Sequence, residues 1–226
     1  MCGRYALTVE PDVLEALFAL DSLPEFEPRF NLAPSQSAPV VVRGDDPETR
    51  TARTMRWGLV PSWAKDSKIG YRTINARSET AAEKPSFRSA FNKRRCLVPA
   101  EWFYEWKREG KQKVPYRLRR ADGQPLALAG LWEHWKGSDA ESARTTFTIL
   151  TTAANDDLAE LHDRMPCILE RDGFERWLTP EVPDEEATAA LLAPAPAGTL
   201  VRDRVSTRLN NVRNEGPELM TPDTLF

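Results

Sequence analysis

The sequence predicts a single α+β domain, mostly β, with curved sheets or an open barrel-like core flanked by short helices. Three observations predict this class. Strand-like runs of apolar and β-branched residues recur along the 226 residues and are separated by turns rich in Gly and Pro. Helix-like patterns are few and short. The chain contains no internal repeat and no low-complexity tract that would divide it.

The first half of the chain begins with an expected helix at residues 9–22, where Pro11 stands in the first turn and apolar side chains recur on one side. Residues 24–36 are predicted as a Pro-punctuated loop, and residues 37–44 as a strand that ends at a Gly turn. Residues 51–63 are predicted as a strand that leads into a Pro break. A short basic helix is expected to begin at Ser86.

The second half is expected to be richer in strands. Its expected elements, in order, are a strand at 96–107, a hairpin turn at 108–113, strands at 114–120, 125–135 and 145–153, an Asn155-capped helix at 155–162, a strand at 165–169, helices at 172–178 and 184–193, and strand character again at 200–212. Helices placed between strands in this way fit one α+β domain.

Composition points to a soluble globular protein, with 41% hydrophobic residues, 29% charged residues and a mean hydropathy of -0.52. No apolar stretch approaches the roughly 18 residues of a membrane span, and the N-terminus lacks the apolar region of a secretory signal. A cytoplasmic location without a membrane partner is therefore expected. Three widely spaced cysteines and two histidines lack the spacing of a metal site or a disulfide framework, so neither is expected.

Charge is unevenly distributed along the chain, although the formal net charge is only -3. Residues 50–120 carry 19 Lys and Arg against 6 Asp and Glu, whereas residues 121–226 carry 9 against 19. This asymmetry favours a basic face turned toward a polyanion. The alternative is a solvated basic surface that the acidic half offsets in space.

The cysteines differ in their surroundings. Cys96 and Cys167 stand in apolar runs and are expected to be buried, whereas Cys2, next to the chain start, has no such cover. Removal of Met1 would leave at Cys2 an α-amine with a pKa of about 7.7–8.0 beside a thiol with a pKa of about 8.5. Such a pair captures an aldehyde, because the amine forms an imine and the thiolate then closes on the imine carbon to give a thiazolidine. Arg4 is placed to hold a phosphate near that carbon.

Two extended stretches carry candidate polar groups. Strand alternation over 101–106 places Glu105 on the face opposite three aromatic residues, where partial desolvation would prepare it for general acid–base chemistry. A surface carboxylate is the alternative. If residues 74–80 are extended, Asn75, Arg77 and Glu79 share a face, with Arg77 suited to phosphate. An Arg77–Glu79 ion pair is the alternative there.

His162 and two tryptophans complete the candidates. His162 ends the predicted helix at 155–162, where the macrodipole favours a protonated ring, and it is either an acid–base group or a helix cap. Trp57 and Trp63 lie among Lys and Arg residues, a combination typical of single-strand binding through base stacking. Burial in the core is the alternative for both tryptophans.

Seven short motifs, taken in order, resemble those of the SRAP family, whose name stands for SOS-response-associated peptidase. The motifs are MCGRY, RFNLAPSQ, RWGLVPSW, INARSET, EWFYEW, LHDRMP and NNVRNEGPEL. They extend from Cys2 to about Leu219, so a single SRAP-like domain over residues 2–226 is expected. One stretch departs from the family pattern, because Lys84 and Pro85 stand where the family often has a bulky or basic residue near the wedge between single strand and duplex.

The resemblance implies a sensor of abasic sites in single-stranded DNA, with or without adjacent duplex, which associates with the nucleoid when bound. In this interpretation Cys2 traps the sugar aldehyde as a thiazolidine crosslink that protects the lesion during replication. Asn75 positions the open sugar, and Glu105 and His162 supply acid–base steps, including those of reversal. The DNA-facing residues expected from it are Gly3, Arg4, Asn31, Pro34, Trp57, Trp63, Arg77, Lys84 and Arg88, with Arg4 and Arg77 on phosphates.

This chemistry needs no metal or other cofactor, and a monomer is expected. Two other functions stay open at this point. A thiol, a histidine and an asparagine also fit a cysteine-type peptidase, including one that acts on itself to remove Met1. The third interpretation is a module that binds single-stranded or modified DNA without a covalent bond.

Overall fold

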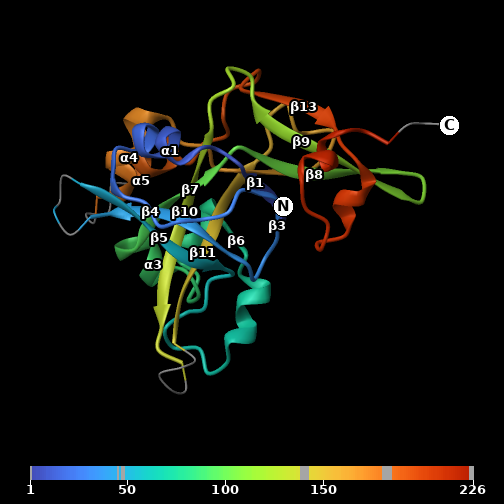
Figure 1. Ribbon diagram of the computed structural model, residues 1–226. Helices are drawn as coiled ribbons and strands as arrows, with labels where there is room; N and C mark the ends of the chain where they lie inside the picture. The colour runs from blue at the N-terminus through green and yellow to red at the C-terminus, as the bar shows by residue number, and fades with distance from the viewer. Residues whose placement is uncertain (1, 45, 47–48, 138–142, 180–184, 224–226) are drawn as a thin grey trace.

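The computed structural model describes residues 2–44, 46, 49–137, 143–179 and 185–223 (Figure 1). Strands dominate this part of the chain, as predicted. They are β1 (Tyr5–Leu7), β2 (Leu20–Ser22), β3 (Arg29–Leu32), β4 (Ser37–Arg43), β5 (Arg50–Trp57), β6 (Asn75–Arg77), β7 (Arg95–Ala100), β8 (Trp102–Glu109), β9 (Gln112–Arg120), β10 (Leu126–Trp135), β11 (Arg144–Ala153), β12 (Arg164–Pro166) and β13 (Leu200–Arg204).

The helices in the described residues are short and occur in the segments that connect strands or follow the last strand. The α-helices are α1 (Pro11–Phe18), α2 (Ser78–Ala81), α3 (Arg88–Lys93), α4 (Arg171–Leu178) and α5 (Glu185–Leu191), and the 3-10 helices are Ser67–Arg72, Thr207–Asn210 and Pro217–Met220. The helix predicted at 184–193 corresponds to α5, and its first residue, Asp184, lies outside the described residues. The mostly β, α+β class is confirmed.

Five strands form a closed barrel rather than the open one expected. Antiparallel pairs link β11 to β10, β10 to β7, β7 to β4 and β4 to β5. A parallel pairing of β11 with β5, in which Phe147 lies opposite Trp57, then closes the ring. Closure gives each of these five strands a partner on both sides, and their buried apolar side chains belong to one large core cluster.

A second sheet, in the order β13-β9-β8-β1-β3, lies beside the barrel. Figure 1 shows β1 between the barrel strands and the long β8–β9 hairpin. The single strand predicted at 96–107 is divided at Glu101, whose backbone N–H donates to the Ala6 carbonyl, so that β7 belongs to the barrel and β8 to the second sheet. The N-terminal strand therefore reaches the junction of the two sheets, and this position brings Cys2 to that junction.

The loop between β5 and β6 carries Trp63 and leads to Asn75. The ends of this loop are close together, since the Leu59 N–H donates to the Thr73 carbonyl and the Trp57 indole N–H donates to the Ile74 carbonyl. Gly58 has a φ of 115°, and a Cβ at this position would lie 2.5 Å from the Gly70 carbonyl oxygen. Only glycine permits this conformation and close approach, which return the chain to β6 beside β11.

Several local predictions are wrong, mainly because contacts with distant residues override the local pattern. The helix expected over 9–22 ends at Phe18, and Leu20–Ser22 form β2, which pairs with β5. Residues 29–32, predicted as part of a loop, form β3 because they pair with β1. Residues 156–161 form turns instead of an Asn155-capped helix, because the Asp157 carboxylate accepts the backbone N–H groups of Gly198 and Leu200. The strand expected over 200–212 ends at Arg204 and is followed by a 3-10 helix.

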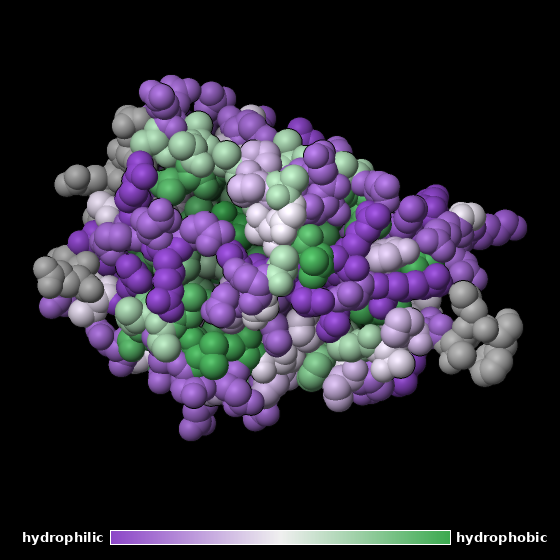
Figure 2. Space-filling view, turned by 90° about the horizontal axis from the view of Figure 1, so that it is seen from above, coloured by the Kyte–Doolittle hydropathy of each residue, from purple (hydrophilic) through white to green (hydrophobic). Residues whose placement is uncertain are grey.

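Apolar side chains are concentrated inside, with a large cluster in the barrel and a smaller one on the second sheet. Cys96 and Cys167 are fully buried, as expected. On the face seen from above, hydrophilic residues cover most of the surface and apolar ones show mainly in recesses (Figure 2). No helix among the described residues is long and apolar enough to cross a membrane.

Candidate active site and DNA-facing surface

Cys2 lies at the junction of the two sheets, and its environment differs from the expected one. It was predicted to lack cover, but its side chain is 0% exposed and belongs to the barrel core cluster. Its thiol faces the Arg4 carbonyl oxygen at 4.0 Å. Burial, and then the nearby Glu105 carboxylate, raise the pKa of the Cys2 thiol well above its ordinary value. With Met1 attached, Cys2 therefore carries a neutral thiol and an amide nitrogen.

Asn75 is in direct contact with the Cys2 backbone. Pairing of β6 with β11, in which Asn75 lies opposite Ile149, brings its side chain beside the N-terminal segment. Its Nδ2 donates to the Cys2 carbonyl oxygen at 2.9 Å. Its Oδ1 is buried and makes no hydrogen bond with any described residue. Asn75 thus holds Cys2 with one end of its amide and offers a hydrogen-bond acceptor with the other.

Glu105, a residue of β8, lies near Cys2. The alternation predicted for this strand is observed, since Trp102 and Tyr104 pack in the smaller apolar cluster while Phe103 packs in the barrel cluster. Glu105 is 4% exposed, and burial raises the pKa of its carboxyl to about 7. At neutral pH both protonation states are therefore populated, as general acid–base chemistry in both directions needs.

His162 follows a turn and not a helix, so no macrodipole acts on its ring. When its Nδ1 carries no proton, that nitrogen accepts the Arg164 backbone N–H at 2.9 Å, and the proton of the neutral ring is then on Nε2. Burial lowers the pKa of His162, although the Asp163 carboxylate, 2.7 Å from the same nitrogen, opposes this effect. The charge of Asp163 also raises the pKa of Glu105 slightly, which places this segment near Glu105.

Arg164 joins the segments that carry Asn75 and His162, and the sequence interpretation missed it. Its guanidinium binds both carboxylate oxygens of Glu79 at 2.6 and 2.8 Å and also donates to the Thr151 carbonyl. The predicted Arg77–Glu79 pair is replaced by this bridge, because Glu79 lies on α2 and not on an extension of β6. The only signal in the sequence was an arginine two residues after His162 in a motif already noted.

Arg4 faces the interior, where the C-terminal segment holds it. Its Nη1 donates to the Asn31 side-chain oxygen and to the Leu209 carbonyl, and its guanidinium lies 5.7 Å from the Trp106 ring centre. Asn31 is fully buried, and its Nδ2 donates to the carbonyls of Asn211 and Asn214. These bonds connect the strand that bears Cys2 to residues near the C-terminus.

Comparison with known proteins places this arrangement in a family. The profile described as SOS response associated peptidase (SRAP) matches residues 1–212. The chain belongs to the SRAP family.

Its relatives resemble it over most of their length. Abasic site processing protein YoqW of Bacillus subtilis is 41% identical over 97% of this chain and 99% of its own. Abasic site processing protein HMCES of Xenopus tropicalis is 32% identical over 97% of this chain and 78% of its own. A crystal structure of a Bacteroides thetaiotaomicron protein, 25% identical, superimposes with a TM-score of 0.87 over 99% of this chain and 100% of the other.

The tryptophans of this SRAP protein occupy opposite environments. Trp57 is 1% exposed, and its ring stacks on Phe147 and contacts Tyr5. The prediction that Trp57 faces DNA is therefore wrong, and the alternative prediction, burial in the core, is correct. Trp63 is 58% exposed, and its indole N–H donates to the Pro85 carbonyl at 3.2 Å. Only Trp63 of the two offers a ring face to a base.

The other predicted DNA contacts of the SRAP chain differ in exposure. Arg77 on β6, Lys84 between α2 and α3, and Arg88 on α3 are exposed. Gly3 and Pro34 are half-buried. Asn31 and Arg4 are buried and are engaged with each other and with the C-terminal segment. Asn31 is therefore a structural residue that holds Arg4.

A further residue that the sequence interpretation missed, Glu215, supports Asn31. One Glu215 oxygen accepts the backbone N–H groups of Phe30 and Asn31, and the other accepts the Arg29 guanidinium at 2.8 Å. Glu215 stands in the motif NNVRNEGPEL near the C-terminus, far in sequence from β3. This carboxylate bridges the C-terminal segment and β3.

Replacing Asn31 with alanine is expected to lower the free energy of unfolding of this SRAP protein by about 2 kcal/mol, because it removes the side-chain acceptor of the Arg4 guanidinium and the donor to two backbone carbonyls. Urea unfolding measures the difference. Asn211→Ala is the matched control, since it removes an exposed amide and keeps the carbonyl that Asn31 contacts. Equal stability of the two variants would contradict this role of Asn31.

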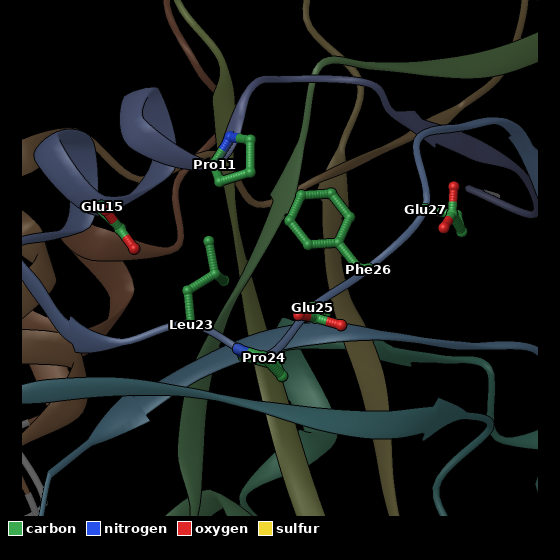
Figure 3. Close-up of a pocket in the computed structure, with 7 residues that line it drawn as sticks. All are labelled: Pro11, Glu15, Leu23, Pro24, Glu25, Phe26 and Glu27. Atoms are coloured by element: carbon green, nitrogen blue, oxygen red, sulfur yellow. The ribbon is translucent and has the colours of Figure 1, made fainter.

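A cavity of about 550 Å³ between α1 and the segment joining β2 to β3 lies apart from these residues. In Figure 3 the side chains of Leu23 and Phe26 point into it, and the carboxylates of Glu15, Glu25 and Glu27 lie around it. None of the predicted site residues lines this cavity. Three carboxylates repel phosphate, so DNA is not expected there.

Proposed function

We propose that this protein senses abasic sites in single-stranded DNA and traps the ring-opened sugar through Cys2 as a thiazolidine crosslink, which protects the lesion during replication. The convergence of Cys2, Asn75 and Glu105 at the junction of the two sheets carries the proposal. The relatives are named abasic site processing proteins, which supports DNA containing abasic sites as the substrate class.

The proposed reaction begins with removal of Met1, which converts the Cys2 amide nitrogen into an α-amine. This amine adds to the sugar aldehyde carbon and water leaves, giving an imine. The Cys2 sulfur then attacks the imine carbon while its proton passes to a base, and the ring nitrogen regains a proton. The net change is loss of one water and formation of one C–N and one C–S bond.

Glu105 and His162 are suited to the proton transfers of this reaction. With a pKa of about 7, the Glu105 carboxyl can donate a proton to the departing water and accept one from the Cys2 thiol beside it. The neutral His162 ring keeps an Nε2 proton that it can donate to a sugar oxygen. The free acceptor of Asn75, Oδ1, suits a sugar hydroxyl.

Basic residues supply the proposed path for the DNA backbone. Arg77, Lys84 and Arg88 are exposed and suit phosphates, and Trp63 suits a stacked base. The Nε of Arg4 makes no hydrogen bond with any described residue, so a phosphate close to Cys2 would give this buried Nε–H an acceptor. Gly3, with no side chain, leaves room for that approach.

Peptidase chemistry on other proteins is less well supported, although the family description includes the word. A thiolate is the nucleophile of cysteine peptidases, and burial keeps the Cys2 thiol protonated at neutral pH. Cleavage of the chain's own Met1–Cys2 bond differs, because the bond to be cut is joined to the site itself. This self-processing is compatible with the proposed function.

The proposed function is tested by mixing the purified protein with a single-stranded oligonucleotide that carries one abasic site. A band that survives heat and SDS is expected. An oligonucleotide whose abasic aldehyde has been reduced to the alcohol is the control, because it keeps the lesion's shape and cannot form an imine. Mass spectrometry of the intact protein reports whether Met1 is present. Lack of a stable band from protein without Met1 would overturn the proposal.

A further inference from the structure

A second cavity, of about 520 Å³, lies among α2, α3, β11 and α5. Six of its lining residues are Ser78, Glu79, Glu83, Phe91, Glu185 and Leu192. Its volume falls in the range of small-molecule sites, roughly 300–1,000 Å³. Cys2, Asn75, Glu105 and His162 do not line it, so it is separate from the candidate active site.

The lining of this cavity combines an apolar wall with negatively charged side chains. Phe91 on α3 and Leu192, the residue after α5, both line it and are each 4% exposed. Glu79, Glu83 and Glu185 add three carboxylates, and the described lining residues include no lysine or arginine. An apolar body and a positive charge are together the complement of such a lining.

We propose that this cavity binds a small organic cation, in which an ammonium or guanidinium group is attached to an aromatic or aliphatic body. The apolar body would displace water from Phe91 and Leu192, and the cation would face the glutamates. A neutral analogue lacks the attraction of Glu83 and Glu185, and of Glu79 to the extent that its charge is not balanced by Arg164, and an anionic analogue is repelled by these carboxylates. The site lies outside the proposed DNA chemistry and does not depend on it.

Glu79 connects this cavity to the candidate active site. The same carboxylate that lines the cavity binds the Arg164 guanidinium at 2.6 and 2.8 Å. The Arg164 backbone N–H in turn holds His162 Nδ1. A ligand cation beside Glu79 competes with Arg164 for its oxygens, so binding weakens this bridge and alters the segment that bears His162. Because the two effects are thermodynamically linked, loss of the Arg164–Glu79 ion pair should in turn increase the affinity of the cavity for the cation.

Titration of the full chain with phenethylamine, followed by amide NMR shifts without DNA, tests the proposal. Saturable shifts are expected at the lining residues. Phenethyl alcohol, which has the same body and no charge, should bind at least about fivefold more weakly, and hydrocinnamate should not bind. The Arg164 Nε–H signal should move in the direction that Glu79→Gln moves it.

Two sets of variants make the outcome decisive. The double variant Glu83→Gln with Glu185→Gln should weaken phenethylamine about fivefold or more, whereas Glu186→Gln, on the same helix and outside the lining, should not. Ala189→Phe, at an exposed lining position, should fill the cavity and remove binding while the thermal unfolding midpoint is kept. Equal binding of amine and alcohol, or unchanged amine binding in both the double and the filled variant, would overturn the proposal. Absence of DNA keeps this result independent of crosslinking.

Discussion

Replacing Cys2 with alanine is expected to abolish the heat- and SDS-stable band formed with abasic single-stranded DNA. The sulfur supplies the bond that closes the thiazolidine, and without it the imine formed by the amine returns to amine and aldehyde in water. The fold should survive, because alanine fills most of the space of this buried side chain. The measurement is denaturing electrophoresis after incubation with the abasic oligonucleotide, with thermal unfolding as the check on folding.

Two further variants separate the thiol from the amine. Cys96→Ala is the matched control, since Cys96 is another fully buried cysteine and lies outside the site, and it should crosslink like the unmodified protein. A chain with extra residues before Met1 that prevent its removal should fail to crosslink, because Cys2 then keeps an amide nitrogen. An undiminished band from Cys2→Ala would contradict the crosslinking proposal.

Replacing Glu105 with glutamine is expected to remove most of the loss of stability that the protein undergoes between about pH 5 and about pH 8. Burial raises the pKa of this carboxyl from 4.5 to about 7. The folded state therefore binds more protons than the unfolded state between these values, and stability is highest below the unfolded pKa and falls as pH rises through the folded one. The gap corresponds to a decline on the order of 3 kcal/mol.

Urea unfolding at several pH values measures this effect. At pH 8 the glutamine variant should be more stable than the unmodified protein, because it buries a neutral amide in place of a carboxylate. Glu109→Gln, on the exposed end of the same strand, is the control and should keep the pH dependence. Parallel stability curves for the Glu105 variant and the unmodified protein would show that the carboxyl is not desolvated.

The same variant bears on the proposed chemistry. A glutamine at position 105 cannot exchange a proton, so crosslink reversal should slow while binding to intact single-stranded DNA persists. If DNA binding is lost as well, Glu105 acts through the structure of the site and not as an acid or base. A more stable and less reactive variant would fit a carboxylate whose buried position is unfavourable for folding and useful for function.

Local patterns were sufficient for features that depend on neighbours in the chain. Alternation along residues 101–106 placed Glu105 and Phe103 on the face opposite Trp102 and Tyr104, because side chains on a strand alternate whatever the partner strand is. Apolar runs around Cys96 and Cys167 correctly indicated burial. The motif resemblance led to the family, because the motifs are themselves local.

Pairings between distant residues decided the rest. Closure of the barrel depends on the register of β11 with β5, and no local pattern encodes which strand lies next to which. That register buries Trp57 against Phe147 and removes it from any DNA surface. The turns after Asn155 likewise follow from hydrogen bonds between Asp157 and residues near 200, which a local helix pattern does not contain.

Cys2 illustrates both kinds of information. A cysteine follows Met1, and Gly3 and Arg4 come next, so an N-terminal aminothiol could be inferred without any structure. The burial of this thiol, the hydrogen bond from Asn75 to the Cys2 carbonyl and the position of Glu105 beside Cys2 all depend on the fold. These contacts join residues about 70 and 100 positions apart. The physical reason is that burial and pKa depend on what the fold brings within a few ångströms, and the spacing of neighbouring residues does not contain that information.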